Sequence, residues 1–245
     1  MLVRYETAPG AVETRRLTPS DPAFVPPPAP EASDVLRTYF GLGVEHILLG
    51  LDHLLFVFAL LLLIRDPWRL AGAITAFTVA HSLSLAAAAL GWLVVPAPPV
   101  EAVVALSIMF VASELARPAG RDLRLSEHAP WSVAFAFGLL HGLGFARALL
   151  DIGLPAEETP LALLAFNLGV EAGQLLFVAA ALAVWAALRR LEPERLARNF
   201  GRGGAGTRGL AYVIGSLAGV WFAGGRLVRP ARGRFLTLPP GPAIA

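Results

Sequence analysis

The sequence predicts an all-α membrane protein: a bundle of about six transmembrane helices, with a short β-like extracytoplasmic segment at the N-terminus. Composition is the first observation behind this class. Of the 245 residues, 56% are hydrophobic and only 16% are charged, whereas soluble proteins carry roughly 25% charged residues. Length is the second observation: apolar stretches recur along the chain, and a bilayer core needs about 20 helical residues for each crossing.

Residues 1–32 differ in composition from everything that follows. "VRYETAPGAVETRRLTPSDPAF" is typical of one or two short strands around a turn, and "VPPPAP" is typical of a stiff polyproline linker. A single strand pair buries too little surface to make a domain. We therefore expect an extracytoplasmic tail, the remnant of an outer domain.

The apolar stretches define a transmembrane bundle over residues 33–228, followed by a C-terminal tail, 229–245. The expected spans are 35–64, 70–90, 99–117, 131–151, 161–188 and 208–227. The first is too long for one straight crossing, and Gly41, Gly43 and Gly50 are places where it can bend. Prolines in the connections act as helix breakers.

The distribution of arginine predicts the orientation of these spans. All 20 basic residues are Arg, yet the net charge is only +2. Connections 65–69, 117–130 and 189–207 contain Arg, whereas 91–98 and 152–160 contain none. By the positive-inside rule the Arg-bearing connections are cytoplasmic, so both termini lie outside. Arginines in the C-terminal tail argue against this orientation for the last helix alone. The pattern is one of membrane topology and excludes a nucleic-acid-binding face.

Charged and polar side chains occur deep in the first span, where each costs several kcal/mol or more unless it meets a partner, water or an ion. The segment "GVEHILLGLDHLLF" contains Glu45, His46, Asp52 and His53. Seven residues make nearly two helical turns, so a continuous helix would stack His46 with His53 and Glu45 with Asp52. The first span is therefore expected to carry one polar flank.

Other spans carry polar groups at a similar depth. His81 in "FTVAHSLSL" and His141 in "FGLLHGLGFA" each lie about ten residues from the cytoplasmic end of a span. The two segments share a pattern typical of a weak internal repeat. Asn167, Glu171 and Gln174 are spaced to form one stripe on the fifth span. We expect these groups to converge near the membrane midplane, where transporters place their sites.

Structural explanations compete with a site at several of these positions. A single membrane His is often a helix–helix hydrogen-bond contact, and a polar stripe can join helices. Glu101 can cap a helix start, Ser107 can serve packing, and Glu114 can pair with Arg117. We nevertheless predict that a second set of residues either supports the metal ligands or lines the path of the ion. These residues are Glu45, Glu101, Ser107, Glu114, Asn167, Glu171 and Gln174.

The histidines taken together predict a metal site, because packing alone seldom needs four of them beside an aspartate. The chain has no Cys, so the ligands predicted are His46, Asp52, His53, His81 and His141. Imidazole and carboxylate suit Ni²⁺, Co²⁺ or Zn²⁺, and ligand type alone does not choose among them. Binding needs neutral His and ionised Asp, so metal uptake should weaken in acid. The prediction requires His53, His81 and His141 to face inward, within about 10 Å of one another.

The segment "HILLGLDH" resembles the H-x5-D-H motif of the HupE/UreJ family of nickel permease-like membrane proteins. "FTVAHSLSL", "VEAVVALSI", "FGLLHGLGFA" and "FNLGVEAGQL" are similar to further blocks of that family, in the same order, over about residues 36–227. The resemblance implies a multi-pass protein of the bacterial inner membrane that handles Ni²⁺ or Co²⁺. It also implies that His46, Asp52 and His53 form the metal motif of the first helix, with His141 in a second signature.

The predicted function is therefore a secondary transporter, not an enzyme, with a divalent metal as its cargo and the lipid bilayer as its surroundings. One alternative is an intramembrane zinc hydrolase of the ceramidase-like type, in which His, Asp and Ser side chains hold Zn²⁺ and an activated water. Another is a non-transporting subunit that delivers metal to the maturation proteins of hydrogenase or urease. Nucleic acid is not an expected partner.

Overall fold

The structure is a computed structural model that describes residues 2–7, 11–16, 31–118, 124–152, 158–200 and 204–227. Strands β1 (Leu2–Thr7) and β2 (Ala11–Arg16) form an antiparallel hairpin, with Leu2 opposite Arg16 and Thr7 opposite Ala11. Strands were expected in this segment. Its extracytoplasmic position stays a prediction, and the polyproline linker and the tail at 229–245 lie outside the described residues.

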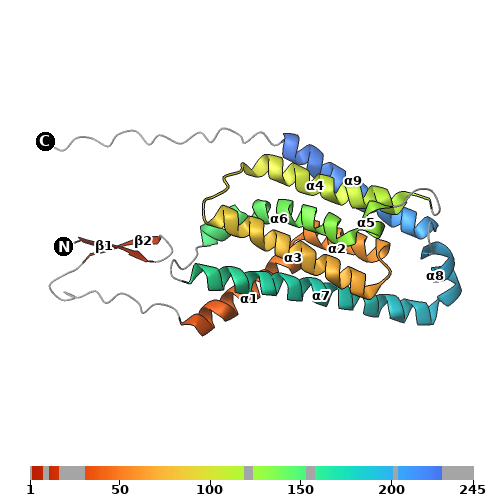
Figure 1. The fold of residues 1–245 in the computed structure, drawn as a ribbon, viewed down its shortest axis with the longest axis horizontal. Helices are drawn as coiled ribbons and strands as arrows, with labels where there is room; N and C mark the ends of the chain where they lie inside the picture. The colour runs from red at the N-terminus through yellow and green to blue at the C-terminus, as the bar shows by residue number, and fades with distance from the viewer. Residues whose placement is uncertain are drawn as a thin grey trace.

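The remaining elements are helices, and the long ones lie alongside one another in a bundle (Figure 1). The long helices are α1 (Ala32–Leu49), α2 (Leu51–Leu63), α3 (Pro67–Ala89), α4 (Ala97–Ala116), α6 (Pro130–Ile152), α7 (Thr159–Leu191) and α9 (Ala205–Leu227). Two short helices, α5 (Leu125–His128) and α8 (Pro193–Phe200), occupy connections in which the sequence predicted no element. The positions of the long helices follow the expected apolar stretches.

Helix α3 shows how local sequence sets an element's start. The Asp66 carboxylate accepts hydrogen bonds from the backbone N–H groups of Trp68 and Arg69, at 2.8 and 3.0 Å. Pro67 occupies the first helical position, where its missing N–H costs nothing. This N-cap, worth about 1 kcal/mol, ends the connection from α2 sharply.

The first apolar stretch breaks at Gly50 into α1 and α2, whose axes differ by 71°. Of the three glycines at which a bend was expected, Gly50 is the one used. A Cβ there would lie 2.8 Å from the His46 carbonyl oxygen and 3.0 Å from His53 Nδ1. The break is therefore built around a residue without a side chain.

Among the described residues, three helices are long and apolar enough to cross a membrane: α3, α4 from Pro98 onward, and α7. The bent pair α1 and α2 makes up to four if it counts as one span. By the same measure α6 is a shorter apolar helix over Pro130–Ala146. The chain is thus a helical membrane protein, and the count of six crossings stays a prediction.

The Arg-bearing connections meet at one end of the bundle. In the first turn of α3, Arg69 Nη2 donates a hydrogen bond to the His128 carbonyl oxygen of α5 at 2.9 Å. Helices α5 and α8 lie at this same end, and the connection from α3 to α4 lies at the other (Figure 1). This arrangement agrees with the alternation of Arg along the sequence.

Close packing between α3 and α6 depends on glycine. A Cβ at Gly138 would fall on the carbonyl oxygen of Phe77, and one at Gly142 on Ser84 Oγ and the His81 carbonyl oxygen. Small residues allow helix backbones to approach closely inside a membrane. Gly138 and Gly142 therefore allow α3 and α6 to pack closely around His81 and His141.

Helices α1 and α7 pack in the same way. A Cβ at Gly43 would fall on the carbonyl oxygen of Phe166, and one at Gly169 on that of Phe40. Farther along, a Cβ at Gly173 would lie 3.3 Å from the Cβ of Ile47. Later residues of α1 thus meet later residues of α7, so the two helices are parallel. This packing fixes the position of the break between α1 and α2 along the length of α7.

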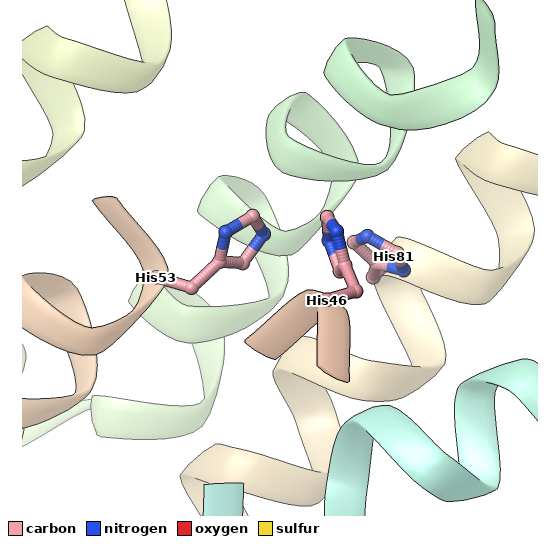
Figure 2. Close-up of side chains that lie close together, drawn as sticks. All are labelled: His46, His53 and His81. Carbon is pink, nitrogen blue, oxygen red and sulfur yellow. The ribbon is translucent and has the colours of Figure 1, made fainter. Parts of the chain in front are cut away.

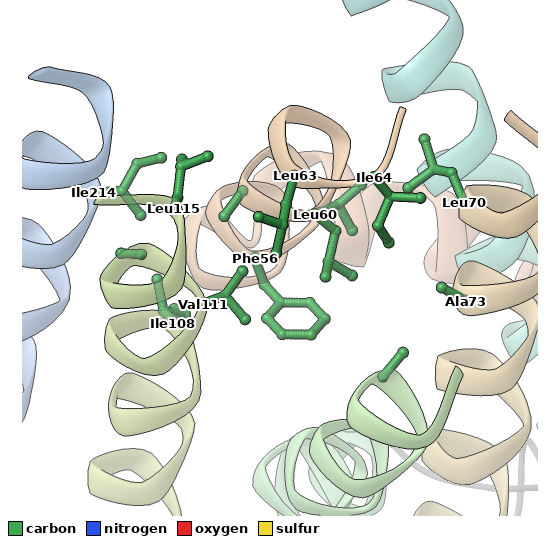
Figure 3. Packing of buried hydrophobic residues seen from close by; sticks show 14 of the residues in the cluster. Phe56, Leu60, Leu63, Ile64, Leu70, Ala73, Ile108, Val111, Leu115 and Ile214 are labelled. Atoms are coloured by element: carbon green, nitrogen blue, oxygen red, sulfur yellow. The ribbon is translucent and has the colours of Figure 1, made fainter. Parts of the chain in front are cut away.

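Two hydrophobic clusters hold the bundle together. The larger joins α2 to α3, α4 and α9, and Figure 3 shows Phe56 and Leu60 at its centre. The smaller joins α1 to α6 and α7 and includes Ile47. Because Ile47 belongs to one cluster and Phe56 to the other, the segment around the break lies between two packed cores.

The outer surface is apolar, as a lipid-facing surface must be. Leu176, Val184 and Val220 are 58%, 59% and 69% exposed. Soluble proteins rarely leave large contiguous apolar patches in water.

Candidate metal centre

The break at Gly50 brings His46, in the last turn of α1, against His53, in the first turn of α2. Their ring centroids are 4.8 Å apart. On a continuous helix, seven residues would separate them by about 10.5 Å along the axis, at about 1.5 Å per residue. The prediction that they stack along one continuous helix is therefore wrong: the bend makes the contact.

His81 on α3 and His141 on α6 complete the cluster. The His53 ring lies 6.1 Å from that of His81 and 4.8 Å from that of His141, and His46 lies 6.2 Å from His81. Figure 2 shows His46, His53 and His81 converging from separate helical segments. His53, His81 and His141 are 4%, 0% and 1% exposed, so they face inward and lie close together, as the metal hypothesis requires.

Two overlapping groups of side chains have the spacing of metal ligands. In one group, nitrogens of His46, His53 and His81 all lie within 4.8 Å of one another. In the other, an oxygen of Asp52 and nitrogens of His53 and His141 do so as well. All five residues predicted as ligands thus come together.

Asp52 orients His53. Its Oδ1 lies 3.0 Å from His53 Nδ1, and an ionised carboxylate can only accept a hydrogen bond, so Nδ1 carries the proton. The lone pair is then on His53 Nε2, which is buried and has no hydrogen-bond partner. A carboxylate behind a histidine is the usual support of a metal-binding imidazole.

Asn167 on α7 does the same for His81. The Asn167 Nδ2 donates to the Leu163 carbonyl oxygen at 2.8 Å, which turns Oδ1 toward His81 Nδ1 at 3.0 Å. His81 Nδ1 therefore donates. Its buried Nε2 has no partner and keeps the lone pair.

Ser107 on α4 sets the opposite tautomer in His141. Its hydroxyl donates to the Val104 carbonyl oxygen at 2.6 Å. With its proton engaged there, Ser107 Oγ accepts from His141 Nε2 at 3.1 Å. The lone pair of His141 is then on Nδ1, which is also buried and unpartnered. Ser107 orients a ligand, a role beyond the packing that the sequence made the simplest explanation.

Four imidazole nitrogens in the described part of the chain are buried without a partner: His46 Nε2, His53 Nε2, His81 Nε2 and His141 Nδ1. A buried polar atom left unpaired costs about 1–3 kcal/mol. Packing contacts do not offset such a cost, whereas a cation bound by these lone pairs removes it. The donor set fits a divalent transition metal.

Aromatic rings enclose the cluster. The Phe145 ring lies 3.9 Å from the His46 ring, and the Phe77 ring 5.1 Å from the His141 ring, centroid to centroid. Neither ring was among the predicted site residues, although Phe77 precedes His81 by one helical turn in the sequence. Apolar walls exclude water and strengthen electrostatic interactions inside.

The polar stripe of α7 faces α3. Beyond the His81–Asn167 pair, Thr78 Oγ1 donates to Gln174 Oε1 at 3.2 Å and Thr75 Oγ1 to Glu171 Oε1 at 2.7 Å. These pairs form a polar seam from His81 toward the Arg-bearing end of the bundle. The stripe thus joins helices and touches the cluster through Asn167.

Glu114 has a different role from either one expected. It is buried, and its carboxylate accepts the backbone N–H groups of Leu125 and Ser126 at 2.6 and 2.9 Å, which caps α5. Pairing with Arg117 is therefore not its function. Glu45 and Glu101 are exposed, and no described contact joins either to the histidines.

No curated protein and no solved structure matches the chain. The family model described as HupE / UreJ protein matches residues 26–223, which includes the whole cluster and most of the chain. The chain therefore belongs to the HupE/UreJ family, a family of membrane proteins tied to the handling of nickel or cobalt.

Proposed function

We propose that this protein is a secondary transporter for a divalent transition-metal ion, Ni²⁺ or Co²⁺. It would cross the bacterial inner membrane six times, with its N-terminus outside. The observation that carries the proposal is the convergence of four buried, unpartnered imidazole nitrogens beside Asp52. Family membership supports the class of ion.

The broken helix favours transport over static binding. Transporters build cation sites at discontinuous helices, where unwound backbone and helix ends meet side-chain ligands. Here the ligands His46, Asp52 and His53 flank such a break. The Asp52 side chain is 36% exposed, against 5% for that of His53, and this difference supports entry of the ion at Asp52.

The polar seam between α3 and α7 provides a path onward. Asn167, Gln174 and Glu171 present oxygen atoms in succession away from His81. Oxygen ligands hold nickel and cobalt less tightly than imidazole. An ion leaving the histidines would therefore move along this seam toward the Arg-bearing, cytoplasmic end.

The test is metal accumulation in cells that express the full chain. His53→Ala and Asp52→Ala should each abolish accumulation of Ni²⁺ and Co²⁺ while the protein still reaches the membrane. His128→Ala is the matched control, because His128 is exposed on α5 and outside the cluster. Unchanged accumulation in both cluster variants would contradict the proposal.

One observation favours an intramembrane hydrolase as a second candidate. A shallow apolar groove of about 420 Å³ opens at Ser107, and its other lining residues are Val103, Leu106, Met109, Phe110 and Phe137. A groove of this kind can hold an acyl chain beside His141. Zn²⁺ that stays bound at one ion per chain through dialysis would support the hydrolase, and rapid exchange would support the permease.

Reconstitution separates transport from metal delivery. Proteoliposomes containing the purified chain should accumulate Ni²⁺ down an imposed gradient. Binding without flux would instead fit a subunit that passes metal to maturation proteins.

A further inference from the structure

His53 belongs to both groups of candidate ligands. It shares one group with His46 and His81, and the other with Asp52 and His141. Its ring centroid is 4.8 Å from that of His46 and 4.8 Å from that of His141. Among the described ring contacts, none joins His141 to His46 or His81. His53 therefore lies between the two groups of candidate ligands and belongs to both.

The distances between the ligand atoms indicate two separate positions for an ion, one in each group. A metal–imidazole bond is about 2.0–2.1 Å long, so even opposite ligands of one ion are only about 4 Å apart. Each group, with its ligand atoms within 4.8 Å of one another, can close on an ion after a small side-chain adjustment. His141 is not grouped with His46 or His81 at this spacing, so a single ion bonded to all five residues would need larger shifts.

The two positions differ in charge and in exposure. The position with Asp52 offers a carboxylate that is 36% exposed, which suits capture of a hydrated cation. The three-histidine position offers only neutral ligands, and His81 there is 0% exposed. The second position is the one that adjoins the seam at Asn167.

From this geometry we propose that one ion occupies the two positions in turn, and that His53 stays bound to it during the transfer. The inference rests on the proposed function and adds the order of ligands to it. Bonds from the ion to Asp52 and His141 break as bonds to His46 and His81 form. The Nε2 of His81 already carries a lone pair, because Asn167 accepts the proton on its Nδ1. The freed Asp52 carboxylate then accepts the N–H of His53, as it does in this structure.

If the ion must pass through both positions, removing either position should stop transport of the ion. The protein should still bind an ion at the position that remains. His81→Ala removes a ligand of the three-histidine position only, and His141→Ala removes one of the Asp52 position only. Purified full-length protein titrated with Co²⁺ should bind one ion in the wild type and in each variant. The variant that retains the tighter position should keep at least about half of the wild-type affinity, because that position is intact. Flux into proteoliposomes should be lost in both variants, while His128→Ala behaves as wild type.

The bound Co²⁺ should also show different ligands in the two variants. X-ray absorption should detect imidazole nitrogen without carboxylate in His141→Ala, and a carboxylate oxygen in His81→Ala. Combining both substitutions should weaken binding more than either alone, by at least roughly 100-fold.

The wild-type protein by itself decides the proposal if a variant fails to fold. Four imidazole nitrogens around a single Co²⁺ would overturn the two-position arrangement and leave the proposed function intact. If one chain bound two ions at once, the proposal that a single ion occupies the two positions one after the other would be wrong. Absence of any Co²⁺ or Ni²⁺ binding would instead overturn the proposed function itself.

Discussion

Three histidines of the cluster each have one nitrogen engaged by a neighbour, and that neighbour decides which lone pair an ion meets. Asp52 and Asn167 engage Nδ1 of His53 and His81, whereas Ser107 engages Nε2 of His141. Because an imidazole carries one proton when neutral, fixing it on one nitrogen frees the other. These neighbours therefore prepare the site before metal arrives.

Replacing Asn167 tests this preparation. Asn167→Leu should weaken Ni²⁺ binding by roughly 10–100-fold, because His81 loses the acceptor that fixes its tautomer and ring. Asn167→Asp retains that acceptor and should recover most of the affinity. Isothermal titration of the purified chain measures both. Equal affinities in the two variants would show that Asn167 only joins α7 to α3.

At the scale of elements, the break between α1 and α2 positions the site. In Gly50→Ala the added Cβ would lie 2.8 Å from the His46 carbonyl oxygen and 3.0 Å from His53 Nδ1. We expect metal accumulation to fall at least roughly tenfold, since 1.4 kcal/mol of lost binding has that effect. Gly41→Ala is the matched control, because a Cβ there meets nothing within 4 Å. Wild-type accumulation by Gly50→Ala would rule out this role of the break.

The contact between α3 and α6 sets the distance from His81 to His141. A Cβ in Gly142→Ala would fall on Ser84 Oγ and the His81 carbonyl oxygen, forcing the helices apart. Overpacking of this kind costs about 1–3 kcal/mol, so thermal unfolding of the purified chain should occur at a lower temperature. Gly144→Ala places its Cβ in ordinary contact, 3.6 Å from Val100, and should unfold like the wild type.

At the scale of the whole molecule, the orientation of the bundle in the membrane can be measured by labelling single introduced cysteines. The chain has no Cys of its own that would react. Val94→Cys lies between α3 and α4, where the residue is 90% exposed, and His128→Cys lies at the Arg-bearing end. A membrane-impermeant thiol reagent should label the first in intact cells and the second only after permeabilisation. The reverse pattern would invert the predicted topology.

The last helix needs a separate test, because arginines follow it as well as precede it. Ala205 is exposed at the start of α9, and Ala205→Cys should be labelled only after permeabilisation if the bundle has six crossings. With the N-terminus outside, labelling in intact cells would mean that an even number of crossings precedes α9, not five.

Much of the fold followed from one-dimensional patterns. Apolar length placed the long helices, although α3 begins at Pro67, three residues before the expected start of its span. Spacing along one helix was a poorer guide: it predicted the contact of His46 with His53 for the wrong reason, since the 71° break produces it. The expected pairing of Glu114 with Arg117 was wrong because the partners of Glu114 lie on α5, a helix that the sequence did not predict.

The sequence by itself determined that the chain is a helical membrane protein, and it predicted His46, Asp52, His53, His81 and His141 as the metal ligands. Burying such groups in an apolar chain is costly enough that residue type and depth already single them out. Only the tertiary structure decided which nitrogen of each imidazole faces the others, and that Ser107 and Asn167 orient them. Those facts depend on contacts between α3, α4, α6 and α7, which no local pattern specifies.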